Sequence, residues 1–409
     1  MKLLFVHQNF PGQFKHLAPA LAHAGHDVCA MAIDGVGLAQ IPMVRYVVGR
    51  GSSREIHPLA ADFETKLIRA DACAAAAVKM KNAGYSPDVI FANPGWGESL
   101  FLKDVWPDAK LLALLEFFYA TRDRDVNFDP EFAIHDIGND ARVRVKNANL
   151  LLTLESMDWG VTPTHFQHST MPRAYANRIS IVFDGIDTQS VRPDAAATFT
   201  LPGKTLRAGD EVLTFINRNL EPYRGYHRFM RALPRILRER PNATVLIVGG
   251  DEVSYGAKAP EGTTWKQMFW DEIKGHLNAD DTSRVHFLGR IPYAAYVKVL
   301  QVSRCHVYLT YPFVLGWSCI EAMSAGCLLV GSATAPVEEV IAHGHNGLLV
   351  DFFDGDALAA TVIDALASPS KVAHLRAAAR ATAMQRYDLA SVCLPQQLQL
   401  LERLAAGAL

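Results

Sequence analysis

The chain has 409 residues, half of them hydrophobic, and its formal net charge at pH 7 is −2. This length exceeds what one hydrophobic core usually supports, so we expect two domains. A near-neutral charge provides no bulk attraction to nucleic acid, and no nucleic-acid partner is therefore expected.

Cysteine usage and the start of the chain predict the compartment. The six cysteines are scattered without a CxxC pair and mostly lie in apolar stretches, which is typical of reduced core thiols in a cytoplasmic protein. The apolar start, residues 1–6, is too short to be a signal peptide, and no run reaches membrane-spanning length. We expect a cytoplasmic protein whose only role at a membrane would be peripheral, at the inner face.

The first half of the chain alternates between strands and helices. Strands are expected at residues 3–6, 27–32, 89–92, 110–115 and 150–154, and helices at 14–24, 63–83 and 140–147. This order predicts a doubly wound parallel sheet whose loops open at its carboxyl edge. Gly12, in the loop after the first strand, would let the backbone approach a ligand there, although a plain loop glycine is an equal interpretation.

Aromatic and acidic side chains follow these strands. Trp96 and Tyr119 could stack on a sugar ring, or they could be ordinary core aromatics. Glu116 ends a strand in a run of Leu and Phe, so partial burial should raise its pKa and suit it to proton transfer. His135, in a polar loop, is a second candidate base or a surface histidine. The Asp-x-Asp sequences at residues 123–125 and 354–356 lack a preceding strand, and we predict no metal site.

The middle of the chain contains a candidate linker. Residues 192–210 are rich in Pro, Ala, Gly and Thr without sustained periodicity, which predicts a connection between domains of residues 1–195 and 205–388. Beyond it, strands are expected at 212–217, 244–248, 285–288, 305–309, 328–331 and 348–350, and helices at 225–240, 293–302 and 336–342. Two such α/β domains would face each other across a cleft.

Arginines cluster after the first strand of this second series. Arg218 and Arg224 would lie at the sheet edge, where two permanent cations suit a diphosphate leaving group. Solvated arginines on a surface loop are the alternative. The following helix carries an arginine face that could contact an anionic membrane but more simply faces solvent: Arg228, Arg231, Arg235 and Arg238.

A loop and a helix start follow the strand at residues 305–309. Backbone N–H groups near Gly316, Trp317 and Ser318, with the positive end of the helix dipole, suit an anion such as phosphate. Glu321, about one turn into the helix, could accept hydrogen bonds from the hydroxyls of a ribose, or it could be a surface acid.

This stretch resembles the donor-site signature of retaining nucleotide-sugar glycosyltransferases of family four, which have the GT-B fold. Gly316 and the sequence from Glu321 to Gly326 match the signature. Phe313 stands where the family has a first acid, which touches hydroxyls of the donor sugar.

The resemblance extends to other candidate donor-site residues. Arg218 and Arg224 are similar to the family's Arg and Lys that grip the donor diphosphate, with Arg224 replacing Lys. Ile291 falls where the family reads the nucleotide base through main-chain groups, and Gly12 lies where the family has a glycine-rich loop.

The resemblance implies an activity. It implies two Rossmann-like domains of the GT-B type, with the first binding the acceptor and a final helix near residues 389–405 crossing back to it. It also implies transfer, with retention, from a nucleoside-diphosphate sugar (UDP in preference to GDP) to a hydroxyl of a glycan or small acceptor, in bacterial-type polysaccharide or glycoconjugate synthesis. The nucleotide sugar would be a co-substrate, and no cofactor or metal is expected. A nucleotide-sugar epimerase and a non-catalytic nucleotide-sugar or glycan-binding protein are the alternatives, and Phe313 supports the latter.

Overall fold

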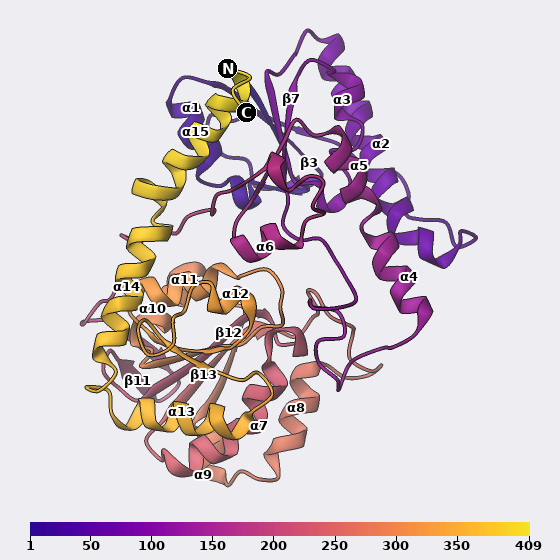
Figure 1. Cartoon of the computed structure of the whole chain (residues 1–409). Coiled ribbons are helices and arrows are strands. Elements are labelled where there is room, and N and C mark those ends of the chain that lie inside the picture. The colour runs from indigo at the N-terminus through magenta and orange to yellow at the C-terminus, as the bar shows by residue number, and fades with distance from the viewer. The chain divides into compact units, whose positions relative to one another are not determined.

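The computed structural model describes residues 1–409, which divide into two compact units. Unit 1 comprises Met1–Asp184 and Ala390–Leu409, and unit 2 comprises Gly185–Leu389. Each unit is an α/β structure built on a parallel sheet (Figure 1). The chain enters unit 2 at Gly185, whereas the sequence predicts a first domain that extends to residue 195.

Unit 1 is organised around a seven-stranded parallel sheet with the strand order β5-β3-β1-β6-β7-β8-β9. β1 pairs with β3 on one side and with β6 on the other, so the loops after β1 and β6 diverge at the carboxyl edge. Open α/β sheets bind ligands at such a point. The strands are β1 (Lys2–Val6), β3 (Asp27–Ala32), β5 (Met43–Arg45), β6 (Val89–Ala92), β7 (Lys110–Leu114), β8 (Trp159–Thr162) and β9 (Ile179–Ile181).

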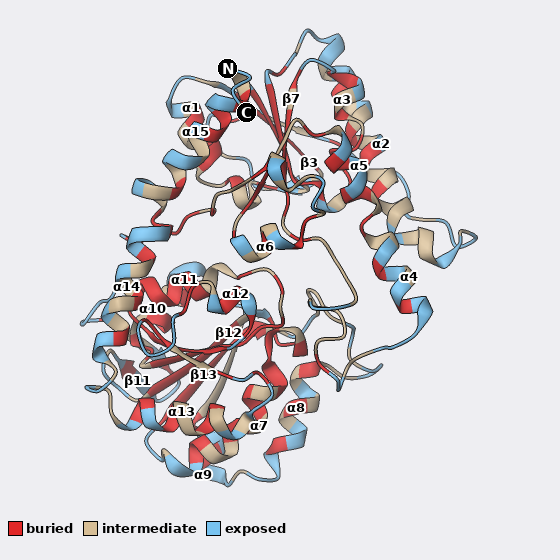
Figure 2. Cartoon of the chain, in the orientation of Figure 1, coloured by how far each residue is buried: buried red, intermediate tan, exposed pale blue.

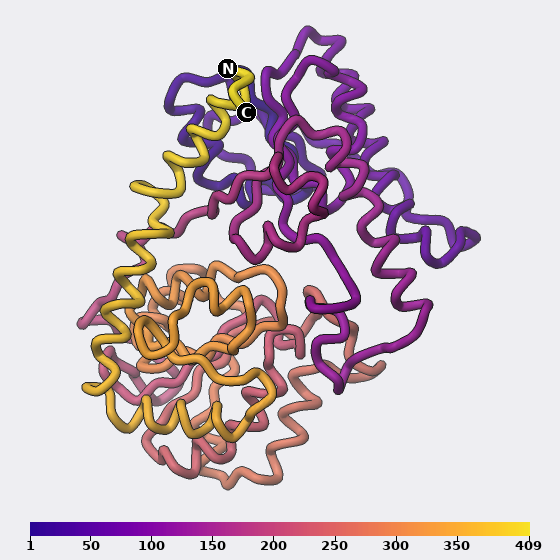
Figure 3. Tube along the Cα trace, in the orientation of Figure 1, coloured from indigo at the N-terminus to yellow at the C-terminus, as the bar shows by residue number.

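Helices cover this sheet, whose central strands are buried (Figure 2). The C-terminal helix α15 packs beside α1, so that the end of the chain lies next to its beginning within unit 1 (Figure 3). Leu400, Leu401 and Leu404 of α15 share a core cluster with Leu17 and Leu21 of α1. The helices are α1 (Leu17–His23), α2 (Ala61–Asn82), α3 (Leu102–Val105), α4 (Ile137–Lys146), α5 (Ala148–Ser156), α6 (His165–Thr170) and α15 (Leu394–Ala405).

The strand predicted at residues 150–154 is wrong, because these residues lie in the helix α5. Leu150 and Leu154 are buried, whereas Leu151 and Leu152 are about half exposed, so the buried positions recur with helical spacing. A short apolar run does not distinguish a strand from a helix, and the run of leucines hides this spacing. The next strand of the sheet is β8, which the sequence did not predict.

Unit 2 contains a six-stranded parallel sheet with the order β14-β13-β12-β15-β16-β17. β12 pairs with both β13 and β15, so the loops after β12 and β15 are neighbours at the carboxyl edge where the strand order reverses. The strands are β12 (Val212–Asn219), β13 (Thr244–Gly250), β14 (Val285–Gly289), β15 (Cys305–Tyr308), β16 (Leu328–Ser332) and β17 (Leu348–Val350).

The helices of unit 2 alternate with these strands along the chain. They are α7 (Tyr226–Glu239), α8 (Trp265–Lys274), α9 (Ala279–Ser283), α10 (Tyr293–Val302), α11 (Trp317–Ser324), α12 (Ala335–Glu338), α13 (Gly355–Ala367) and α14 (Ala373–Tyr387). Except for α9, which follows α8, and α14, which follows α13, each helix begins after the carboxyl end of a strand, so several of the loops at this edge lead into a helix start.

The predicted linker at residues 192–210 contains a β-hairpin of unit 2, so its prediction as irregular chain is wrong. Strand β10 (Thr198–Leu201) pairs antiparallel with β11 (Lys204–Arg207). Pro202 and Gly203 form the turn between them, and Gly203 has a φ of +75°, which glycine adopts readily. The alternating Thr-Phe-Thr-Leu sequence followed by Pro-Gly is a hairpin signal.

The arginine face of α7 is largely paired with acids. Arg231 forms two hydrogen bonds with Glu272, of 2.6 and 3.1 Å, and Arg235 pairs with Glu239 at 2.9 Å. The opposite side of α7 is buried, and Phe229 stacks on Phe215 of β12 with ring centroids 4.6 Å apart. These ion pairs favour the solvent-facing interpretation of the arginine face. None of the helices combines the length and apolar character that spanning a bilayer requires.

All six cysteines are buried free thiols. Burial raises the pKa of five of them: Cys29, Cys73, Cys305, Cys319 and Cys327. These thiols are core residues, as the sequence predicts.

His306 makes the stability of unit 2 dependent on pH. Its ring is fully buried in β15, where Nδ1 lies 2.9 Å from Thr214 Oγ1, and burial lowers its pKa to about 3. Between about pH 6.5 and pH 3 the unfolded chain binds a proton that the folded chain does not, so stability falls as the pH falls. The slope is expected to reach about 1.4 kcal/mol per pH unit.

Urea unfolding of the wild type and of His306→Asn between pH 7 and pH 4.5 measures this contribution. The free energy of unfolding should fall less steeply with acid in the variant. His276→Asn is the control, because the His276 ring is exposed to water before and after unfolding. Equal slopes for the wild type and His306→Asn would contradict the prediction.

Candidate active site

Arg224 is a buried cation at the carboxyl edge of the unit 2 sheet. It ends a short turn (Pro222–Arg224) after β12, and its side chain is 6 % exposed. Its Nη1 donates hydrogen bonds to Thr310 Oγ1 at 2.8 Å and to the carbonyl oxygen of Val314 at 3.0 Å. Both acceptors are neutral, and no carboxylate lies within 4.0 Å of the guanidinium. Burial lowers the pKa of Arg224, but neighbouring groups raise it overall, and among them the buried carboxylate of Glu221 acts electrostatically without accepting a hydrogen bond from the guanidinium. A buried cation whose direct acceptors are neutral is suited to an anionic ligand.

Aromatic rings form the walls around Arg224. The guanidinium carbon lies 5.0 Å from the centre of the Tyr255 ring and 5.6 Å from that of Phe313. Tyr223 packs against Phe313 with ring centroids 5.1 Å apart. These rings keep water from the cation, which strengthens its attraction for an anion.

Gly225 allows the chain to turn from Arg224 into α7. Its φ is +70°, and a Cβ atom at this position would lie 2.3 Å from Leu309 Cβ in the neighbouring loop. Glycine is therefore required both for the backbone conformation and for the close approach of the two loops.

Glu221 holds in place the loop that carries Tyr255. Its buried carboxylate accepts hydrogen bonds from three consecutive backbone N–H groups, those of Ser254, Tyr255 and Gly256, at 3.1, 3.2 and 3.0 Å. Charge-assisted bonds of this kind fix a loop more firmly than neutral ones. Glu221 thereby keeps the Tyr255 ring over Arg224.

The start of α11 lies on the same loop as the acceptors of Arg224. Gly316 is the extended N-cap residue, and its N–H donates to Tyr308 Oη at 2.8 Å. No side chain caps the helix, and Val314, which binds Arg224, lies two residues before Gly316. The structure therefore brings the helix start near Gly316 and Ser318 together with Arg224, and Trp317 begins the helix there.

Glu321 lies one turn into α11 and is 5 % exposed. Its Oε1 accepts a hydrogen bond from Tyr293 Oη at 2.7 Å, and its Oε2 accepts one from Tyr296 Oη at 2.6 Å. Both tyrosines belong to α10, which begins two residues after Ile291. Glu321 is therefore a buried acid in a defined polar setting, which contradicts the interpretation as a surface helix acid.

The structure does not join Arg218 to this group. Arg218 is exposed near the end of β12. The neighbouring Asn219 is buried: its Nδ2 donates to Ser254 Oγ at 2.7 Å, and its Oδ1 accepts from Arg290 Nη2 at 3.0 Å. The role of Arg218 in diphosphate binding stays a prediction.

A polar network lies at the carboxyl edge of the unit 1 sheet and has Glu116 as its centre. Gln13 Nε2 donates to Glu116 Oε1 at 2.8 Å, and Asn93 Nδ2 donates to Glu116 Oε2 at 3.2 Å. Gln13 comes from the loop after β1 and Asn93 from the end of β6, so both sides of the switch point contribute. The two amide donors fix the orientation of the Glu116 carboxylate.

His7 extends this network to the end of β1. Its Nδ1 accepts the backbone N–H of Asn9 at 3.0 Å, so Nε2 carries the proton that faces Gln13 Oε1 at 2.8 Å. Burial lowers the pKa of His7, which keeps the ring neutral. Gly12 has a φ of +48°, and a Cβ atom there would lie 2.4 Å from the His7 ring, so glycine is needed beside this ring.

The other candidates of unit 1 are placed differently. Trp96 is half-buried and meets the His7 ring edge-on at 4.9 Å between centroids, next to the Glu116 network. Tyr119 carries the ammonium of Lys146 over its ring at 3.7 Å. His135 lies exposed before the start of α4.

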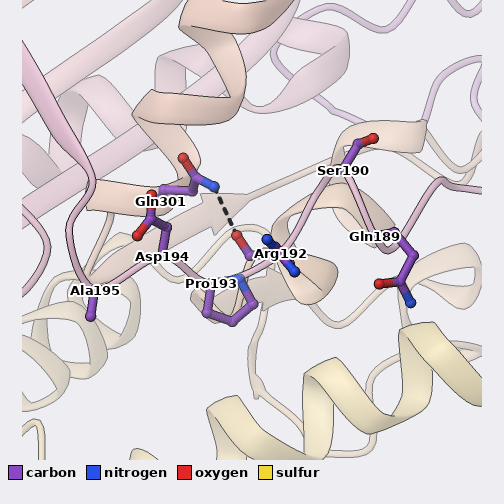
Figure 4. Close-up of a pocket in the computed structure, with 7 residues that line it drawn as sticks. All are labelled: Gln189, Ser190, Arg192, Pro193, Asp194, Ala195 and Gln301. Atoms are coloured by element: carbon purple, nitrogen blue, oxygen red, sulfur yellow. Dashed lines mark hydrogen bonds between the residues drawn. The ribbon is translucent and has the colours of Figure 1, made fainter.

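The pocket of unit 2 drawn in Figure 4 is not this site. Its lining includes Gln301 at the carboxyl end of α10, where Gln301 Nε2 donates to the carbonyl oxygen of Arg192 at 2.9 Å. Because α10 starts at the carboxyl edge of the sheet, its other end lies at the amino edge. The remaining lining residues are Gln189, Ser190, Pro193, Asp194 and Ala195. None of the candidate donor-site residues lines it.

The sequence patterns did not identify several residues that the structure places at the candidate sites. Tyr293 and Tyr296 are three residues apart at a helix start, and this spacing places them on one helical face, a signal that could have been used. Tyr255 in unit 2 and His7, Gln13 and Asn93 in unit 1 follow strand ends, and only the tertiary structure of each unit brings them to its own candidate site.

Two family models match the chain and together span most of it. The model described as glycosyl transferase family 4 group matches residues 24–191, and that described as glycosyl transferases group 1 matches residues 199–382. The chain belongs to glycosyltransferase family 4. The fold of this family member is GT-B, with one parallel α/β sheet in each unit.

Solved structures with this fold match the chain over its length. The sucrose-phosphate synthase of Thermosynechococcus elongatus has a TM-score of 0.74, 18% identity, and complete coverage of both chains. Anabaena HepE in complex with UDP has a TM-score of 0.67 and 18% identity, covering 98% of this chain and 99% of its own.

A curated relative matches part of the chain. The glycogen synthase of Mycobacterium tuberculosis (strain CDC 1551 / Oshkosh) is 27% identical over 216 residues, which is 52% of this family 4 chain and 46% of the relative. The match thus spans less than half of that relative's length.

Proposed function

We propose that this family 4 protein transfers a sugar from a nucleoside-diphosphate sugar to a hydroxyl acceptor, with retention of anomeric configuration. The observation that carries the proposal is Arg224, a buried cation with only neutral hydrogen-bond partners beside the start of a helix. A diphosphate supplies a negatively charged hydrogen-bond partner in direct contact with the guanidinium. As the glycosidic bond breaks, negative charge grows on the leaving diphosphate, and Arg224 and the first N–H groups of α11 stabilise it there.

The remaining residues take roles that follow from their chemistry. Glu321 accepts hydrogen bonds from the ribose hydroxyls, and the main chain at Ile291 meets the base. Arg218 adds a second cation for the diphosphate. No step requires a metal ion, because permanent cations and helix N–H groups supply the positive charge.

Unit 1 provides the acceptor side of the proposed reaction. Glu116 accepts the hydrogen bond of the attacking hydroxyl, because its carboxylate lies at the carboxyl edge of the sheet and two amide donors fix its orientation. Trp96 offers a ring to an acceptor sugar, and Tyr119 would contact the sugar with the ring face that Lys146 does not cover. The acceptor is a glycan or small hydroxyl compound of polysaccharide or glycoconjugate synthesis.

The donor base is proposed to be uracil, and HepE, of the same fold, was crystallised with UDP. Thermal-shift titration with UDP, GDP, ADP and their sugar conjugates tests both the site and the base, because a ligand of the folded state raises the melting temperature. We expect UDP to stabilise the protein more than GDP, without added metal. No response to any nucleotide would overturn the donor site.

A non-catalytic nucleotide-sugar-binding protein is the second candidate, and Phe313 favours it. This ring is 3 % exposed and packs between Tyr223 and Tyr255, where it offers no hydrogen bond to a sugar. Release of UDP from a stabilising UDP-sugar, assayed with a panel of acceptor sugars, separates the candidates. Turnover excludes the binding protein, and binding without turnover supports it.

A further inference from the structure

Two tyrosines of α10 hold the Glu321 carboxylate. Tyr293 and Tyr296 are the first and fourth residues of α10, and their ring centroids lie 5.6 Å apart with an interplanar angle of 31°. Each donates its phenol hydrogen to a different oxygen of the same carboxylate. A symmetrical arrangement of this kind fixes the plane of the carboxylate as well as its position.

The Glu321 carboxylate has more acceptor positions than the two tyrosines occupy. An ionised carboxylate has about four acceptor positions. The tyrosines occupy one position on each oxygen, and these are the two hydrogen bonds that the Glu321 carboxylate makes. One position per oxygen remains, which matches two hydroxyl donors on adjacent carbons.

The phenols also act as fixed hydrogen-bond donors to the carboxyl group that a ligand meets. Each oxygen of the Glu321 carboxyl group accepts a hydrogen bond from one phenol. Both phenols remain donors, since burial raises the pKa of Tyr293 and of Tyr296 and the neighbouring Glu321 raises it further. The site therefore presents two acceptor atoms to a ligand at the carboxylate.

We propose that Tyr293 and Tyr296 are positioning residues that direct Glu321 toward a vicinal diol and so make the donor site select ribonucleotides over 2′-deoxyribonucleotides. This inference rests on the proposed donor site and adds the two residues that determine its sugar selectivity. Tyr296 is 9 % exposed and acts as a fixed support, whereas Tyr293 is 53 % exposed and supports the oxygen on the open side.

Calorimetric titration of the full chain with UDP and 2′-deoxy-UDP tests the proposal. The wild type should bind UDP at least about tenfold more tightly than its deoxy analogue, since the analogue leaves one acceptor unused. In Tyr296→Phe, UDP should bind about tenfold more weakly and 2′-deoxy-UDP about as before, so that the ratio approaches about one. Tyr293→Phe should act in the same direction by a smaller factor.

Control variants make each outcome decisive. Tyr175→Phe removes a phenol that donates to Glu155 in unit 1 at 2.9 Å, and it should leave both affinities unchanged. If Tyr296→Phe fails to fold, the affinities of Tyr293→Phe for the two nucleotides test the proposal, because Tyr293 is half exposed and its substitution should disturb the fold less. If the folded variants keep the wild-type ratio of UDP affinity to 2′-deoxy-UDP affinity, the role of the tyrosines is wrong while the proposed donor site still stands. Tighter UDP binding by Tyr293→Phe would have the same meaning. Absence of nucleotide binding by the wild type overturns the proposed donor site as well.

Discussion

Replacing Arg224 with methionine is expected to weaken UDP binding by at least about 100-fold, because charge-assisted bonds from a desolvated guanidinium are strong. The methionine side chain has a similar length and leaves Tyr255 and Phe313 a surface to pack on, but it carries no charge. The first N–H groups of α11 would then face the diphosphate alone. Isothermal titration of the purified variant with UDP measures the loss.

The control for this experiment is Arg231→Met. Arg231 lies on α7 of the same unit, and its charge is already matched by Glu272. UDP affinity should therefore stay within about twofold of the wild type, since exposed ion pairs contribute little. Equal affinity in Arg224→Met and Arg231→Met would show that Arg224 does not bind the diphosphate.

Glu116→Gln is expected to lower the rate of sugar transfer by about 100-fold while leaving UDP binding unchanged. Glutamine preserves the shape of the side chain but replaces one acceptor oxygen with an amide donor, which conflicts with the amide donated by Gln13 or Asn93. The acceptor hydroxyl would lose its charged partner. Initial rates of UDP release at saturating acceptor, beside UDP titration, separate the two effects.

A second acid of unit 1 tests whether the loss of sugar transfer depends on the position of Glu116 or only on removing one negative charge from the unit. Glu155→Gln removes a carboxylate from the exposed surface of the same unit and should leave the transfer rate unchanged. If Glu116→Gln transfers sugar at the wild-type rate, the acceptor hydroxyl is held by another group. If it loses UDP binding as well, the acceptor-side role of Glu116 is wrong.

How much of the fold the sequence predicts depends on how distinct each local pattern is. The helix at residues 293–302 was predicted with the bounds of α10, because Pro292 precedes an apolar pattern with helical spacing. The strand at residues 150–154 was wrong, because a run of leucines carries no readable period. The hairpin of residues 198–207 was missed in a segment interpreted by composition alone.

The residues of the candidate site also differ in whether a local sequence motif predicts them. Arg224, Gly316 and Glu321 were identified from the sequence because each follows a strand end in a short local motif. Tyr293 and Tyr296 come from a different helix, 28 and 25 residues away from Glu321 along the chain. Their pairing with Glu321 depends on how α10 and α11 pack, and no local pattern records it. Arg218 is the opposite case: its place in the sequence motif predicts a site residue, but the structure leaves it exposed.

The burial of all six cysteines makes this protein a convenient carrier for a site-specific fluorescent probe. Maleimide dyes react with exposed thiolates, and the native thiols are both covered and held in their neutral form by burial. A cysteine introduced at Lys258, exposed in the loop that carries Tyr255, would be labelled selectively without removing any native cysteine. Its emission would then report movement of that loop when a nucleotide binds.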